Sequence, residues 1–97
     1  MTTSPDSSLF LLGTSHQVAN LNERESIALP TDSIDSFYRG LQELDGLKEC
    51  LVLNTCNRTE IYGAAEDNLK IEVVSNYLAE FRELDPEFIS QKTYRRA

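Results

Sequence analysis

The sequence contains no long apolar run. Its apolar stretches are all far shorter than the roughly 20 residues that a membrane-spanning helix needs, so no membrane partner is expected. The first eight residues, MTTSPDSS, also lack the basic region and apolar segment of a secretory signal. Their composition is typical of a disordered tail over residues 1–8.

Cysteine is scarce, with only Cys50 and Cys56 in the chain. If the residues between them form a strand, their Cα atoms lie roughly 20 Å apart, at about 3.3 Å per residue. A disulfide bond needs a Cα separation below about 7 Å, so the two thiols are not expected to pair with each other. Two unpaired thiols and no secretory signal favour the reducing cytosol, and we expect a cytoplasmic protein.

Basic residues are a minority: nine Lys and Arg face sixteen Asp and Glu, and the net charge is −7. This balance opposes non-specific binding to nucleic acid, because such binding depends on Lys and Arg that displace counterions from phosphates. A basic cluster occurs only at the C-terminus, KTYRRA. The cluster ends without a cap or turn, which indicates that the sequence stops inside a longer protein.

Two common site signatures are missing. The chain has no G-x-G-x-x-G or phosphate-binding loop, and therefore no nucleotide-binding signature of its own. The spacing of Cys50, Cys56 and His16 matches no C-x-x-C zinc pattern and a fourth ligand is not evident. We therefore expect no metal site.

The chain has the composition of one soluble globular domain. Its 97 residues suffice for one domain and not for two, and 40% apolar and 26% charged residues are ordinary values. The apolar run 9–15 predicts a strand, and Asn20 is a suitable cap for a short helix over 21–28. Apolar residues at steps of three and four predict a second helix within 31–46, capped by one of its first three residues.

The run 48–55, KECLVLNT, is nearly continuous in apolar character, which is typical of a central strand buried on both faces. With the following TEIYGAAE it predicts a hairpin over 48–65. A third helix carries its apolar stripe on five residues: Ile71, Val74, Tyr77, Leu78 and Phe81. Asp67 or Asn68 is its expected N-cap, Pro86 is expected to begin a further short turn, and QKTYRR predicts a last strand.

The order strand, helix, strand, strand, helix, strand is that of the split βαβ, ferredoxin-like fold. We therefore predict an α+β domain over residues 9–97, with a four-stranded antiparallel sheet and helices on one face.

Cys56 is the first candidate for chemistry, because it follows an apolar run and lies among polar residues in NTCNRTEIY. A thiol reacts as the thiolate, which the charge of Arg58 and hydrogen bonds from Thr55 and Asn57 can stabilise. Free backbone N–H groups in the turn can stabilise an oxyanion, and Glu60 can hold Arg58 in place. The alternative is a passive half-buried thiol beside an ordinary turn. The spacing alone leaves both open.

His16, the only histidine, follows the first strand, and Arg24 lies in the short helix after it. His16 can act as a base or substrate contact, or only as a local hydrogen-bonding group. Arg24 can support a site, or be a solvated helix charge paired with a neighbouring Glu. A Cys and a His at one sheet edge would indicate acyl transfer.

The motifs resemble those of the N-terminal catalytic domain of glutamyl-tRNA reductase. The family pattern G-x-x-H-x-x-A-x-x-x-x-R-E occurs in GTSHQVANLNERE, and the signature T-C-N-R-x-E-I-Y follows about thirty residues later. The matching residues are Gly13, His16, Ala19, Arg24, Glu25, Thr55, Cys56, Asn57, Arg58, Glu60, Ile61 and Tyr62. The resemblance covers residues 9–97. Gln17 and Asn20 depart from the commoner family residues.

The resemblance implies an enzyme of tetrapyrrole (5-aminolevulinate) biosynthesis that converts glutamyl-tRNA to glutamate-1-semialdehyde. It implies that Cys56 forms a glutamyl thioester and that Thr55, Asn57 and Arg58 line the glutamate pocket, with His16, Arg24 and Glu60 in supporting roles. It further implies that NADPH, bound by a domain absent from this chain, reduces the thioester. Full-length members are expected to be homodimers that channel product to the downstream aminomutase, and the fragment alone is not expected to reduce anything.

Two other functions share this strand and helix order. One is a ferredoxin-like ligand- or RNA-binding module, for which Phe10 and Tyr62 would be the stacking aromatics, although the net charge opposes it. The other is a cysteine hydrolase fragment, which differs in what accepts the acyl group.

Overall fold

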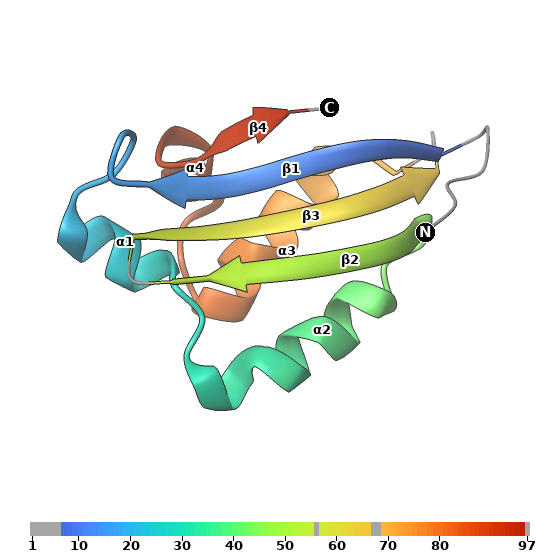
Figure 1. Cartoon of the computed structure of the whole chain (residues 1–97), viewed down its shortest axis with the longest axis horizontal. Coiled ribbons are helices and arrows are strands. Elements are labelled where there is room, and N and C mark those ends of the chain that lie inside the picture. The colour runs from blue at the N-terminus through green and yellow to red at the C-terminus, as the bar shows by residue number, and fades with distance from the viewer. Residues whose placement is uncertain (1–6, 56, 67–68, 97) are drawn as a thin grey trace.

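The computed structural model describes residues 7–55, 57–66 and 69–96. Within them the chain forms four strands, four α-helices and one short 3₁₀ helix (Figure 1). In chain order these are β1 (Ser7–Ser15), α1 (Leu21–Ile27), η1 (Thr31–Ser33), α2 (Ile34–Gln42), β2 (Leu47–Asn54), β3 (Arg58–Glu66), α3 (Ile71–Arg82), α4 (Pro86–Gln91) and β4 (Tyr94–Arg96). The part of the predicted tail at residues 1–6 lies outside the described residues, and β1 begins at Ser7, two residues before the predicted strand.

The strands form one antiparallel sheet in the order β2-β3-β1-β4. β1 pairs with β3 along its whole length, from Ser7 opposite Glu66 to Ser15 opposite Arg58. β2 and β4 are the edge strands, on β3 and β1 respectively. The predicted ferredoxin-like α+β fold and the predicted hairpin are confirmed.

The helices α2 and α3 pack against one face of the sheet. In the view of Figure 1, α3 lies behind the strands and α2 appears below β2. Leu12 of β1 and Ile61 of β3 point into this layer, where both are almost completely buried. The two helices meet through aromatic rings: the ring of Phe37 lies 5.0 Å from those of both Tyr77 and Phe81. Because strand side chains alternate, the neighbours of Leu12 and Ile61 point to the opposite face, which α2 and α3 leave uncovered.

Two helix starts follow from the local sequence. Asn20 and Glu23 form a reciprocal capping box at the start of α1, as the position of Asn20 predicted. Asp85 accepts a hydrogen bond from the amide of Glu87, and Pro86 occupies the first turn of α4. These caps fix where the chain enters each helix.

Two sequence-based predictions were wrong. β2 is an edge strand rather than a central one, and Leu51 in its middle is 61% exposed. Its apolar run is divided between the two faces: Cys50 and Val52 pack against the core, while Leu51 points to the uncovered face. The N-cap of α3 is Lys70. The residues predicted for that role, at 67 and 68, lie outside the described residues.

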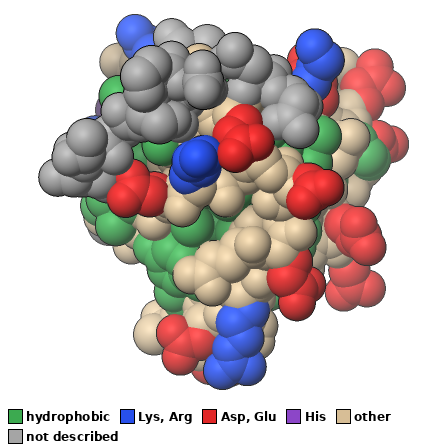
Figure 2. Space-filling view, turned by 90° about the vertical axis from the view of Figure 1, so that its right-hand side faces the viewer, with side chains coloured by type: hydrophobic (Ala, Val, Ile, Leu, Met, Phe, Trp, Pro, Cys, Tyr) green, Lys and Arg blue, Asp and Glu red, His purple; other side chains and the backbone are tan. Residues whose placement is uncertain are grey.

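Acidic side chains are more frequent than basic ones on the end of the molecule seen in Figure 2. This distribution agrees with the net charge of −7. No helix among the described residues is long and apolar enough to cross a membrane.

Candidate functional site

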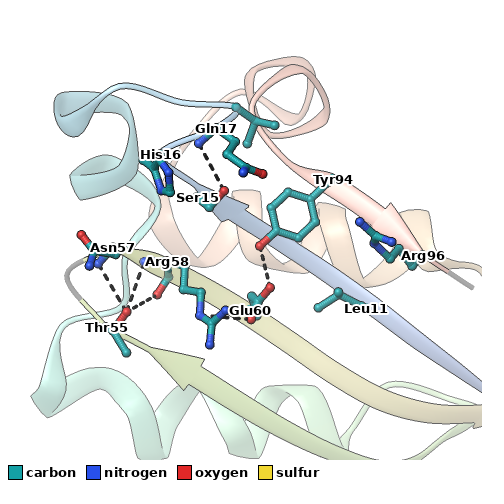
Figure 3. Close-up of a pocket in the computed structure, with 11 residues that line it drawn as sticks. Leu11, Ser15, His16, Gln17, Thr55, Asn57, Arg58, Glu60, Tyr94 and Arg96 are labelled. Atoms are coloured by element: carbon teal, nitrogen blue, oxygen red, sulfur yellow. Dashed lines mark hydrogen bonds and ion pairs between the residues drawn. The ribbon is translucent and has the colours of Figure 1, made fainter.

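An open cavity of about 900 Å³ lies on the uncovered face of the sheet (Figure 3). It is built from the end of β1 and the loop after it, the turn between β2 and β3, the start of β3, and β4. Its lining residues are Leu11, Ser15, His16, Gln17, Val18, Thr55, Asn57, Arg58, Glu60, Tyr94 and Arg96. The antiparallel register explains the assembly, because the end of β1 lies opposite the beginning of β3.

Most of the predicted site residues line this cavity: His16, Thr55, Asn57, Arg58 and Glu60. Cys56 itself lies outside the described residues. Its neighbours in the sequence, Thr55 and Asn57, both line the cavity. Arg24 instead lines a smaller neighbouring cavity of about 130 Å³, which it shares with Thr55 and Arg58.

The turn before β3 is organised by the side chain of Thr55. Its hydroxyl oxygen accepts hydrogen bonds from the amides of Asn57, at 3.3 Å, and Arg58, at 3.2 Å. The amide of Thr55 donates to the carbonyl of Arg58 at 2.8 Å. The prediction that the turn offers free backbone N–H groups is therefore wrong for Asn57 and Arg58, because the Thr55 hydroxyl already occupies both.

Glu60 is the buried charge of the site, with 5% of its surface exposed. Its Oε1 accepts a hydrogen bond from Tyr62 at 2.8 Å and lies 3.6 Å from Nε of Arg58, as predicted for the residue that holds this arginine. Its Oε2 accepts from Tyr94 at 2.6 Å. Burial by itself would raise the pKa of Glu60, but the two tyrosine hydrogen bonds and the charges of Arg58 and Arg96 outweigh burial and lower it.

Tyr94 and Arg96 are cavity residues that sequence reasoning missed. Burial and the hydrogen bond to Glu60 raise the pKa of the Tyr94 hydroxyl to about 12, so it stays protonated and able to donate at neutral pH. The available signal was the alternation within the predicted last strand, where these two residues share a face. The register that brings the strand beside β1 is a tertiary property, which the sequence did not reveal.

A family model described as "Glutamyl-tRNAGlu reductase, N-terminal domain" matches residues 12–97 of this chain. The chain belongs to this family. A glutamyl-tRNA reductase from Alkalilimnicola ehrlichii is 36% identical over 87 residues, which cover 90% of this chain and 19% of that protein. A glutamyl-tRNA reductase from Prochlorococcus marinus is 35% identical over 81 residues, which cover 82% of this chain and 18% of that protein. The chain thus spans about a fifth of the length of the relatives it matches.

The solved glutamyl-tRNA reductase from Methanopyrus kandleri has the same fold. The match has a TM-score of 0.58 and covers 91% of this chain and 18% of that one. At 18% sequence identity the likeness concerns the fold alone.

The residues of the reductase family's upstream block lie at one end of the sheet. His16 is exposed at the edge of the large cavity, just beyond β1 (Figure 3). Arg24 is half-buried, and its Nη1 donates to the carbonyl of Ala19 at 2.8 Å, which ties α1 to the loop before it. Among the described residues no ion pair joins Arg24 to a neighbouring Glu, and its side chain lies at the smaller cavity.

The other thiol, Cys50, lies away from this cavity, half-buried against the core. Burial raises the pKa of its thiol above the ordinary value. Cys50 therefore has little thiolate at neutral pH, which makes it an internal reference for the reactivity of Cys56.

Proposed function

We propose that this domain accepts the glutamyl group from glutamyl-tRNA as part of a glutamyl-tRNA reductase. The observation that carries the proposal is that the residues on either side of Cys56, Thr55 and Asn57, line one cavity together with Arg58. Membership of the reductase family supplies the substrate class.

In the proposed step, the thiolate of Cys56 attacks the ester carbonyl that joins glutamate to the 3′ end of the tRNA. A C–S bond forms, the ester C–O bond breaks, and the tRNA leaves with its 3′ oxygen, which takes up a proton. The product is a glutamyl thioester, which is more electrophilic than the ester it replaces. The cysteine thus divides one difficult reaction into two easier ones.

Arg58 is the proposed partner for a carboxylate of the substrate. Its side chain is 53% exposed at the cavity, so it can reach a ligand without leaving its ion pair with Glu60. The guanidinium group carries further N–H donors besides the one on Nε, and their planar arrangement matches both oxygens of a carboxylate. Thr55, whose hydroxyl ties the turn together, is proposed to keep Arg58 and Asn57 at this cavity.

NADPH is proposed to bind another part of a longer reductase, because this chain has no G-x-G-x-x-G loop to receive its diphosphate. That part would supply the hydride that reduces the thioester. The net charge of −7 opposes binding to the body of the tRNA. We therefore propose that other parts of the longer reductase contact the body of the tRNA, while this domain holds the aminoacylated 3′ end.

The alternative of an RNA-recognition module needs exposed aromatic rings on the central strands. Phe10 instead packs against the core, and its ring occupies the space beside Gly63 on the covered face. The hydroxyl of Tyr62 is engaged by Glu60. The ring of Tyr62 is 38% exposed, so the sheet presents one of the two proposed aromatic rings and not the pair.

The test is transfer of radiolabelled glutamate from glutamyl-tRNA to the protein. We expect an acid-stable protein adduct that hydroxylamine releases, present in the wild type and in Cys50→Ser and absent in Cys56→Ala. Cys50→Ser is the matched control, because it removes the other thiol of the chain. Equal labelling of the wild type and Cys56→Ala, or no labelling of the wild type, would contradict the proposed function.

A further inference from the structure

The carboxylate of Glu60 crosses a neighbouring strand to reach its partner. Gly13 of β1 is paired with Glu60 of β3 on one side and with Tyr94 of β4 on the other. Residues two strands apart have backbones separated by about 10 Å, twice the spacing of paired strands. The oxygen atoms of Glu60 and Tyr94 nevertheless lie 2.6 Å apart, so the two side chains meet above Gly13 (Figure 3).

Gly13 permits this crossing because it has no side chain. A Cβ atom at this position would lie 2.7 Å from Cγ of Glu60 and 3.0 Å from the carbonyl oxygen of Thr59. The nearer distance is below any normal carbon–carbon contact, so a larger residue would displace the Glu60 side chain from the space above β1.

The hydrogen bonds from Tyr94 and Tyr62 hold different oxygens of the Glu60 carboxylate. Tyr94 holds Oε2, and this leaves Oε1 directed at Nε of Arg58. At 3.6 Å the contact between Oε1 and Nε is an ion pair rather than a short hydrogen bond, and a rotated carboxylate would change it readily. Tyr62 donates to Oε1 only, so it cannot replace the hydrogen bond that Tyr94 donates to Oε2.

We propose that Tyr94 is a positioning residue for Arg58: by holding Oε2 of Glu60 above Gly13, it fixes the guanidinium that receives the substrate's carboxylate. The role of Arg58 towards substrate rests on the proposed function. The relay itself, from Tyr94 through Glu60 to Arg58, does not.

The other groups that face Glu60 are few. The cations are Arg58 on its own strand and Arg96 on β4, and the remaining titratable group is Tyr62. On β1 the paired residue is Gly13, which carries no charge. Tyr94 is therefore the one neutral donor that reaches Glu60 from another strand, among the contacts of the described residues.

The first experiment measures the relay without substrate. In Tyr94→Phe, we expect NMR of the carboxyl carbon to show a higher pKa for Glu60, and NMR of the side-chain nitrogen to show a shifted, faster-exchanging Nε–H of Arg58. Tyr77→Phe is the matched control, since its hydroxyl donates a 2.9 Å hydrogen bond to the carbonyl of Phe37, remote from the site. A purely structural Tyr94 would leave both signals as in Tyr77→Phe, and that result would overturn the proposal.

The second experiment measures glutamyl transfer against the concentration of glutamyl-tRNA. In Tyr94→Phe we expect the half-saturating concentration to rise about threefold to tenfold, the effect of one weakened hydrogen bond, with the maximal rate within about twofold. Tyr77→Phe should leave both unchanged. If NMR shows the relay but the half-saturating concentration is unaltered, Tyr94 does not position substrate. If the wild type transfers nothing, the proposed function fails, and the NMR experiment still decides the relay.

Discussion

The side-chain amide of Asn54 forms two hydrogen bonds with the backbone of Leu29. Its Nδ2 donates to the carbonyl of Leu29 at 2.7 Å, and its Oδ1 accepts from the amide of Leu29 at 3.3 Å. The same Oδ1 accepts from the hydroxyl of Thr59 at 2.8 Å. Asn54 is the last residue of β2, so this arrangement fixes the cavity turn both to β3 and to the segment after α1.

Asn54→Ala is expected to lower the free energy of unfolding by about 1–3 kcal/mol, because it leaves two backbone groups of Leu29 without their partners. Urea denaturation of the variant and the wild type measures this loss. Asn22→Ala is the control, since Asn22 is an exposed residue of α1, where alanine favours the helix. A loss in Asn54→Ala no greater than that in Asn22→Ala would show that the paired hydrogen bonds contribute nothing.

Gly13→Ala is expected to separate Glu60 from Tyr94. The added Cβ displaces the Glu60 side chain, and the pKa of Tyr94 should fall below about 12, because burial still raises it but the hydrogen bond and charge of Glu60 no longer do. NMR of the tyrosine ring carbons measures the pKa. Gly40→Ala is the matched control: its Cβ meets the hydroxyl of Tyr77 on the helical side, so it should disturb packing without changing Tyr94. The same Tyr94 pKa in both variants would contradict the crossing above Gly13.

Glu60 is expected to make the free energy of unfolding depend on pH. Its pKa is lower in the folded than in the unfolded state, so its contribution is present above about pH 4.5 and is lost as the pH falls through the folded value. Unfolding by urea at pH 7 and pH 4 should therefore show a smaller acid-induced loss in Glu60→Gln than in the wild type. The control is Glu49→Gln, at an exposed position of β2. An equal acid-induced loss in all three proteins would exclude this role.

Much of the fold follows from periodicity in the sequence. Steps of three and four placed α2 and α3, and the cap at Asn20 placed α1, because these features depend on neighbours along the chain. The position of β2 in the sheet depends on its partners instead. An apolar run predicts a strand equally well at an edge or a centre, and the exposure of Leu51 became evident only from the strand order.

The candidate site was likewise predictable only where it depends on neighbours along the chain. Thr55, Asn57 and Arg58 were identified because they lie within two positions of Cys56, and the antiparallel register brings His16 to the same cavity. Tyr94 was missed because its contact with Glu60 spans 34 positions and depends on the register of a three-residue strand. The role of Gly13 was missed for the same reason: it is evident only when both flanking strands are placed.

Cys56 is expected to react faster than Cys50 with a thiol reagent at neutral pH. Burial raises the pKa of Cys50 and keeps it largely protonated, whereas the exposed Arg58 two residues from Cys56 can stabilise a thiolate. Mass spectrometry of peptides sampled over time measures each site separately. In Cys50→Ser the fast reaction should remain, and in Cys56→Ser only the slow one. Raising the pH should accelerate the slow site more than the fast one, because its thiolate fraction is further from saturation. Equal and slow rates at both cysteines would exclude an activated nucleophile in this domain, and the glutamyl transfer proposed above would then need a group from elsewhere to activate Cys56.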